Sequence, residues 1–124
     1  MKELTQAEEQ IMQVLWNIEK GFVKDVIEQL PEPKPAYNTV STIIRILEKK
    51  EFVGHIAYGK THEYFPTVEK EAYTKEFMKG IVKNYFSNSF KQMVSFFAND
   101  SKISLKEIDE IKAMMEKEIE NNNK

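Results

Sequence analysis

YNTVSTIIRILEKK, residues 37–50, is the segment on which the fold depends. It contains no Gly or Pro, and its apolar residues recur at helical spacing along one face. These residues are Val40, Ile43, Ile44 and Leu47. The opposite face carries polar and basic residues within an arc of roughly 60°, with nothing acidic among them. They are Asn38, Thr42, Arg45 and Lys49. The segment predicts an amphipathic helix with one apolar face and one polar, basic face.

Two shorter helical patterns precede this segment. Thr5 and Glu8 have the spacing of a capping box, which predicts a helix from Thr5 to about Glu19. Gly21, which tolerates positive φ, ends that pattern. A second pattern, from Val23 to Leu30, runs into a connection that holds three prolines. We therefore expect only a short helix there.

A β-hairpin is predicted directly after the segment. Residues 52–58 are rich in β-branched and aromatic side chains, Gly59-Lys60 is typical of a tight turn, and residues 61–65 return before Pro66. Three helices followed by a hairpin are the order of a winged helix, a helix-turn-helix variant whose hairpin is the wing.

The hairpin holds both histidines of the chain. With Gly59 and Lys60 at the centre of the turn, His55 and His62 lie on the same face, and Tyr64 comes near His55. No third ligand converges on this pair in the sequence. We therefore expect wing residues that are exposed or contact phosphate, and no metal site. We likewise expect no cofactor.

The rest of the sequence predicts helices only, at about 70–83, 88–98 and 104–120. These helices carry more apolar and aromatic surface than they can hide among themselves, which predicts that a second copy of the chain covers it. The residues expected in this contact are Phe77, Ile81, Phe90, Leu105, Ile108, Ile111, Met115 and Ile119. The expected fold is mainly α with a small β-hairpin. It comprises a winged helix-turn-helix domain at 1–70 and a helical dimerisation domain at 71–124.

The composition limits the possible function. The 124 residues, 41% hydrophobic and 31% charged, suit one folded domain or two small ones and leave little room for a deep enzymatic cleft. The absence of Cys excludes disulfides, a thiol nucleophile and Cys-ligated metals. The sequence has no nucleophile with a nearby base and no Gly-rich phosphate loop, so we expect no enzyme. Apolar runs are short and the first ten residues lack a signal-peptide profile. We therefore expect no membrane insertion and a cytoplasmic location.

Positive charge is concentrated in one part of the chain. The net charge is -2, but residues 34–62 hold five cations against only Glu48 and Glu51. In a winged helix the third helix enters the major groove of double-stranded DNA and the wing grips the flanking phosphates. We therefore predict DNA binding through Tyr37, Asn38, Thr39, Thr42, Arg45, Lys49, Lys50, Lys60, Thr61 and His62.

Contacts to bases are expected from the helix. Arg45 suits the O6/N7 edge of guanine, and Asn38 suits an adenine edge or a phosphate. The methyl groups of Thr39 and Thr42 suit thymine methyls. Two alternatives stay open: the polar face is the solvated side of an ordinary helix, or the winged helix binds proteins and no DNA. A protein-contact module more often shows an apolar or acidic stripe at these positions, which favours DNA.

Three stretches, in this order and spacing, resemble the penicillinase-repressor family, the BlaI/MecI/CopY group of bacterial transcriptional regulators. They are Leu4-Thr5-Gln6-Ala7-Glu8 with Ile11-Met12 and Val14-Leu15-Trp16, then Tyr37-Asn38-Thr39-Val40 through Arg45-Ile46-Leu47-Glu48-Lys49-Lys50, then Gly59-Lys60-Thr61-His62-Glu63-Tyr64. The resemblance covers nearly the whole chain. It implies a homodimeric repressor that binds a palindromic operator in front of a β-lactamase, resistance or metal-homeostasis gene. Glu51 departs from the family, in which Gly commonly ends this helix.

The resemblance also implies a way in which repression is relieved. In the β-lactam branch, a membrane sensor with a cytoplasmic zinc protease leads to cleavage of the repressor at an Asn-Phe bond in its penultimate helix. The matching bond here is Phe96-Phe97, and Phe96 replaces the Asn. Two adjacent Phe on a helix rarely both face water, so we expect at least partial burial of these rings. The copper branch uses a Cys-rich tail, and a chain without Cys is not regulated in that way.

Overall fold

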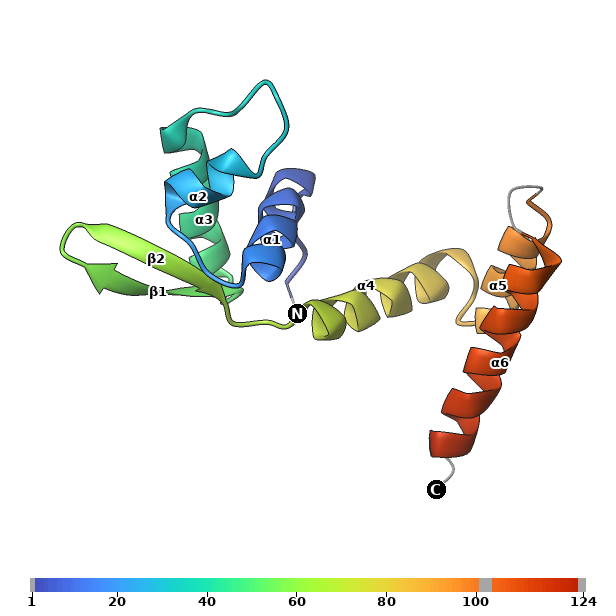
Figure 1. Cartoon of the computed structure of the whole chain (residues 1–124). Coiled ribbons are helices and arrows are strands. Elements are labelled where there is room, and N and C mark those ends of the chain that lie inside the picture. The colour runs from blue at the N-terminus through green and yellow to red at the C-terminus, as the bar shows by residue number, and fades with distance from the viewer. Residues whose placement is uncertain (1, 101–103, 123–124) are drawn as a thin grey trace. The chain divides into compact units, whose positions relative to one another are not determined.

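The structure, a computed structural model, describes residues 2–100 and 104–122, without the side chains of residues 108, 115 and 118–122. Its helices are α1 (Gln6–Ile18), α2 (Val23–Glu28), α3 (Tyr37–Lys49), α4 (Lys70–Tyr85), α5 (Phe90–Ala98) and α6 (Leu105–Asn122). Its strands are β1 (Val53–Tyr58) and β2 (Thr61–Pro66) (Figure 1). Every helix and strand predicted from the sequence is present, and the fold class is confirmed. None of the described helices is long and apolar enough to cross a membrane.

The chain divides into two compact units, residues 1–76 and 77–124. The division falls inside α4, so the first turns of this helix belong to the first unit. The predicted border of the two domains lies six residues earlier, after residue 70. The two units are described separately below.

In the first unit, α1, α2 and α3 pack around one apolar core, and the hairpin extends from them (Figure 1). The predicted apolar face of α3 lies in this core: Val40, Ile44 and Leu47 are fully buried and Ile43 is half-buried. Burial of these side chains holds the helix in place, since its exposed residues contribute little apolar area. The opposite face of α3 is therefore left to solvent.

The loop between α2 and α3 is held by a lysine. The Lys34 Nζ donates to the carbonyl oxygens of Ile27, Glu28 and Leu30 at 3.2, 3.1 and 2.8 Å. Carbonyls at the end of a helix lack partners within it, and a cation there also complements the helix dipole. Lys34 therefore fixes the connection that leads into α3.

The wing has the predicted register. Tyr58 pairs with Thr61, which leaves Gly59 and Lys60 as the two turn residues, and Gly59 has a φ of 64°. A positive φ costs glycine little, so this residue allows the tight turn. An isolated bridge between Gly21 and Tyr64 joins the hairpin to the loop after α1. The wing is thereby tied to the helices at its base.

The beginning of α4 is attached to α1. The Trp16 indole N–H donates to the Val68 carbonyl at 2.8 Å, and the Tyr73 hydroxyl donates to a Glu9 carboxylate oxygen at 2.9 Å. The rings of Trp16 and Tyr73 lie 5.5 Å apart. Burial and the Glu9 carboxylate raise the pKa of Tyr73 to about 12. These contacts make the first turns of α4 part of the first core.

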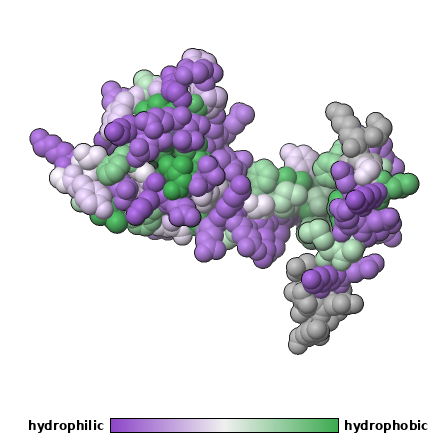
Figure 2. All heavy atoms as spheres, viewed as in Figure 1, coloured by the Kyte–Doolittle hydropathy of each residue, from purple (hydrophilic) through white to green (hydrophobic). Residues whose placement is uncertain are grey.

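The second unit contains the end of α4 with α5 and α6. The Ser104 hydroxyl accepts a hydrogen bond from the Glu107 N–H at 3.2 Å and so caps the last helix. Many large apolar side chains of this unit are exposed, and Figure 2 shows such residues (green) at the surface of α4 and α5. Phe96 and Phe97, which were expected to be at least partly buried, are 63% and 45% exposed in the single chain, so their burial is only partial. The short helix α5 packs too little against its neighbours to cover them.

Candidate nucleic-acid interface

The polar face of α3 forms a continuous exposed surface. Its predicted residues Asn38, Thr42, Arg45 and Lys49 are all exposed, as are Tyr37 and Thr39 in the first turn. The Thr42 hydroxyl donates to the Asn38 carbonyl at 2.8 Å. Because the apolar face of α3 is fully engaged in the core, the helix cannot rotate to hide this surface. It is available to a partner along the whole length of the helix.

Arg45 lies where α3 meets the wing. Its positive charge acts on the hydroxyl of Tyr64, a buried residue of β2. Burial and the Glu48 carboxylate raise the pKa of Tyr64, while Arg45 opposes them.

The two histidines stack on the wing face, as the register predicted. The rings of His55 and His62 are parallel within 5°, with centroids 4.1 Å apart, and Tyr64 lies tilted against both. The His55 Nδ1 also contacts a Glu48 carboxylate oxygen on α3. His62 is half-buried in this stack, so only part of its ring is accessible. Among the described residues, no group of three or more His, Cys, Asp or Glu is arranged to hold a metal ion.

The tip of the wing carries the remaining predicted contacts. Lys60 in the turn and Thr61 at the start of β2 are both exposed. No acidic residue lies between Tyr58 and His62. The tip therefore presents one positive charge beside a hydroxyl, which suits a phosphate group.

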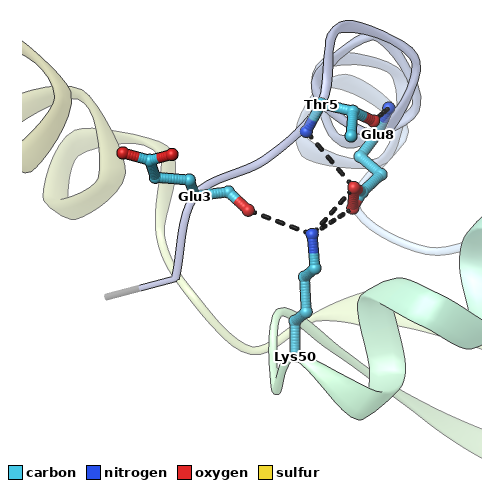
Figure 3. Close-up of polar contacts among 4 residues, drawn as sticks. All are labelled: Glu3, Thr5, Glu8 and Lys50. Carbon is cyan, nitrogen blue, oxygen red and sulfur yellow. Dashed lines mark hydrogen bonds and ion pairs between the residues drawn. The ribbon is translucent and has the colours of Figure 1, made fainter.

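Lys50 is engaged elsewhere (Figure 3). Its Nζ lies 2.8 Å from both carboxylate oxygens of Glu8 and 3.0 Å from the Glu3 carbonyl. Burial alone would raise the pKa of Glu8, but hydrogen bonds from Lys50 and Thr5 outweigh it and lower the pKa. The structure therefore gives Lys50 a partner inside the chain, whereas Lys49 next to it is exposed. The contact with DNA that the sequence predicts for Lys50 stays a prediction.

Two relevant residues were missed from the sequence. Glu48 connects α3 to the wing through His55, and the sequence gives no sign of a pairing across this distance. Ile46 is 40% exposed beside Arg45. The sequence could have predicted this exposure, because Ile46 follows the exposed Thr42 by four residues and residues spaced by four share a helix face.

The predicted dimerisation residues are also on the surface where the structure describes them. Phe77, Phe90, Leu105 and Ile111 are exposed, and Ile81 is half-buried. The other three, whose side chains lie outside the described ones, are Ile108, Met115 and Ile119.

Comparison with known proteins places the chain among repressors. The family model for the penicillinase repressor matches residues 4–117. The methicillin resistance regulatory protein MecI of Staphylococcus aureus (strain N315) is 24% identical over 116 residues, which are 93% of this chain and 94% of MecI. The penicillinase repressor of Bacillus licheniformis is 24% identical over 115 residues, 92% and 90% of the two chains. Among solved structures, that of the DNA-binding domain of the repressor BlaI is similar with a TM-score of 0.50 and 26% identity. The matched region is 59% of this chain and 94% of the BlaI domain.

Proposed function

The chain belongs to the penicillinase repressor family, a family of transcriptional regulators rather than enzymes, and from this premise we propose that it is a sequence-specific repressor that binds a palindromic operator as a homodimer. The observation that carries the proposal is the exposed polar face of α3. Four polar or basic side chains project from a helix whose other face packs in the core. This is the geometry with which a winged helix enters the major groove.

The residues of the interface divide into two proposed roles. Arg45 and Asn38 contact base edges, since a guanidinium suits guanine and an amide suits adenine. Lys49, Lys60 and Thr61 contact phosphates, which position the protein without selecting a sequence. Tyr37 at the start of α3 and His62 in β2 are the remaining proposed contacts to DNA.

The homodimer is supported by the apolar surface of the second unit. Tyr85, Phe96 and Leu105 are 78%, 63% and 81% exposed. Soluble monomers rarely leave so many large apolar groups in water, whereas a two-fold dimer would cover them. Two winged helices in such a dimer would contact two half-sites in inverted order, which makes the operator a palindrome.

We propose that the chain controls resistance or stress-response genes in the cytoplasm and that proteolysis relieves repression. The S. aureus relative is named a methicillin resistance regulatory protein, and the B. licheniformis relative is named a penicillinase repressor. The peptide bond between Phe96 and Phe97 is the proposed cleavage site, and a membrane sensor protease the proposed partner. The exposure of both rings supports access of a protease to this part of α5.

The test is selection of duplexes from a random DNA library by the purified full chain, followed by gel-shift titration. We expect enrichment of a palindromic sequence and a loss of at least about fivefold in affinity for Arg45→Ala. Lys70→Ala, which removes an exposed cation at the start of α4, is the matched control and should leave affinity within about twofold. A library that shows no enrichment, or equal effects of the two variants, would contradict the proposal.

Proteolytic relief needs its own experiment. The chain is expressed together with the membrane sensor protease proposed as its partner, and fragment masses are measured after induction. We expect fragments that end at or next to Phe96. An intact chain under full derepression would contradict proteolysis, whereas a cut before residue 70 would contradict only the site.

A further inference from the structure

An apolar side chain interrupts the polar face of α3. Ile46 is 40% exposed, whereas the neighbouring aliphatic residues Ile44 and Leu47 are fully buried. Ile46 follows Thr42 by four residues and Thr39 by seven, and these spacings place the three side chains in one row along the helix. All three are exposed. We call Thr39, Thr42 and Ile46 the methyl row.

Thr42 adds its methyl group to this row because its hydroxyl proton is already used. The Thr42 Oγ1 donates to the Asn38 carbonyl at 2.8 Å, a bond made within the helix. A direct contact to a base acceptor would require this bond to break. The methyl group has no competing role, and Ile46 next to it has no polar atom in its side chain.

The position of Ile46 does not follow from packing. Ile46 belongs neither to the buried core nor to the partly buried residues packed against it, and a solvated helix face favours a polar or charged residue there. In the proposed function, however, this face enters the major groove. The one apolar group that base pairs present in that groove is the 5-methyl group of thymine.

We propose that the methyl row contacts thymine 5-methyl groups in each half-site, with Ile46 as the residue that determines this preference. The inference rests on the proposed function and adds a specificity to it. Removing one buried methyl contact weakens binding about fourfold, and removing it from both half-sites about fifteenfold. Arg45 and Ile46 are consecutive, so guanine recognition by hydrogen bonds and thymine recognition by apolar contact come from adjacent residues.

The experiment removes the methyl group from the DNA and its partner from the protein. A duplex selected by the full chain is synthesised with deoxyuridine in place of each thymine in turn, at symmetric positions. Uracil keeps the base pairing of thymine and lacks only the 5-methyl group. We expect at least one thymine position at which the wild type loses about fifteenfold in affinity. Ile46→Ala should bind the thymine and uracil duplexes equally.

Two controls make the result specific. Lys49→Ala removes an exposed neighbour on the same face, and it should weaken both duplexes alike while keeping the preference for thymine. Ile46→Val keeps a branched aliphatic side chain and should keep most of the preference. Thermal melting of each variant shows whether the fold is intact, which we expect because Ile46 and Lys49 are both exposed.

The outcomes separate the inference from the function. If no duplex is enriched, both the proposed function and the inference are wrong. If a duplex is bound tightly but uracil is tolerated at every position, the inference is wrong and the function stands. A thymine preference that Ile46→Ala retains would also overturn the role of Ile46.

Discussion

Lys50 at the end of α3 and Glu8 in the first turn of α1 form an ion pair, although 42 positions separate them in the chain. The Glu8 side chain is 5% exposed and the Lys50 side chain 24% exposed. The same Glu8 carboxylate accepts the Thr5 N–H, so one buried group serves both the cap of α1 and the position of α3. A cation from the basic segment thus orients the proposed recognition helix.

The first prediction concerns the loss of this cation. Lys50→Met leaves the Glu8 charge buried without its partner, which we expect to lower the free energy of unfolding by about 2–3 kcal/mol. Lys49→Met removes the same charge one residue earlier, at an exposed position, and should change stability by no more than about 0.5 kcal/mol. Urea denaturation of the two variants measures the difference. Equal destabilisation would show that the ion pair contributes nothing beyond net charge.

The second prediction is a loss of stability in acid. Hydrogen bonds from Lys50 and Thr5 outweigh burial and hold the pKa of Glu8 below its ordinary value of 4.5. A lowered pKa in the folded state means that this stabilisation is complete above the ordinary pKa and is lost as the pH falls through the folded value. We expect the free energy of unfolding to decline below about pH 5. Glu8→Gln should show a smaller decline between pH 7 and pH 3, whereas Glu28→Gln, at an exposed position, should follow the wild type.

The sequence predicted those features that depend on local pattern. The helical period of the segment 37–50 placed its buried and exposed faces correctly, because an amphipathic helix has one way to bury its apolar side. Gly59-Lys60 predicted the hairpin register and hence the face shared by His55 and His62. In both cases the residues involved are close in sequence or fixed by a turn.

Pairings between distant residues could not be predicted in this way. The partner of Lys50 depends on how α1 packs against α3, and the partner of Glu48 on how the wing lies against the same helix. The sequence predicted at least partial burial of Phe96 and Phe97, but not how much of each side chain stays exposed. How far two adjacent Phe are covered depends on what packs over them, and in the single chain the short helix α5 has too few neighbours to cover both.

The third prediction follows from the backbone at the end of α3. Glu51 has a φ of 66°, in the left-handed region that costs residues with a Cβ about 1 kcal/mol. Glu51→Gly should therefore raise the free energy of unfolding by up to about 1 kcal/mol. Lys49→Gly, two residues earlier at the last position of the helix, should instead lower it, by up to about 1 kcal/mol. Thermal or urea denaturation decides the matter, and a destabilising Glu51→Gly would rule out strain at this residue.

The fourth prediction separates base contacts from phosphate contacts. Arg45→Ala should weaken operator binding by about 1–3 kcal/mol and relax the base preference at the positions it contacts. Lys60→Ala should weaken binding to all duplexes alike and lower the slope of log affinity against log salt by about one. Gel shifts with specific and unrelated duplexes at several salt concentrations measure both effects. Full affinity and specificity in Arg45→Ala would show that α3 is not the recognition helix.

The fifth prediction tests whether the second unit holds the dimer. Deletion of residues 77–124 should give a folded monomer, because the bonds from Trp16 to Val68 and from Tyr73 to Glu9 keep the start of α4 in the first core. A deletion that begins at Glu71 also removes Tyr73, which is 8% exposed, and should be less stable.

Without a linked second half-site contact, operator affinity should fall by a factor on the order of 100 or more, since the second contact in a dimer is effectively intramolecular. Binding to an isolated half-site should change little, which distinguishes lost linkage from a damaged DNA-binding surface. Sedimentation of the chain that ends at Glu76 gives its oligomeric state directly. If that shortened chain is still a dimer, residues 2–76 contain the interface, and the exposed apolar side chains of α5 and α6 have another partner.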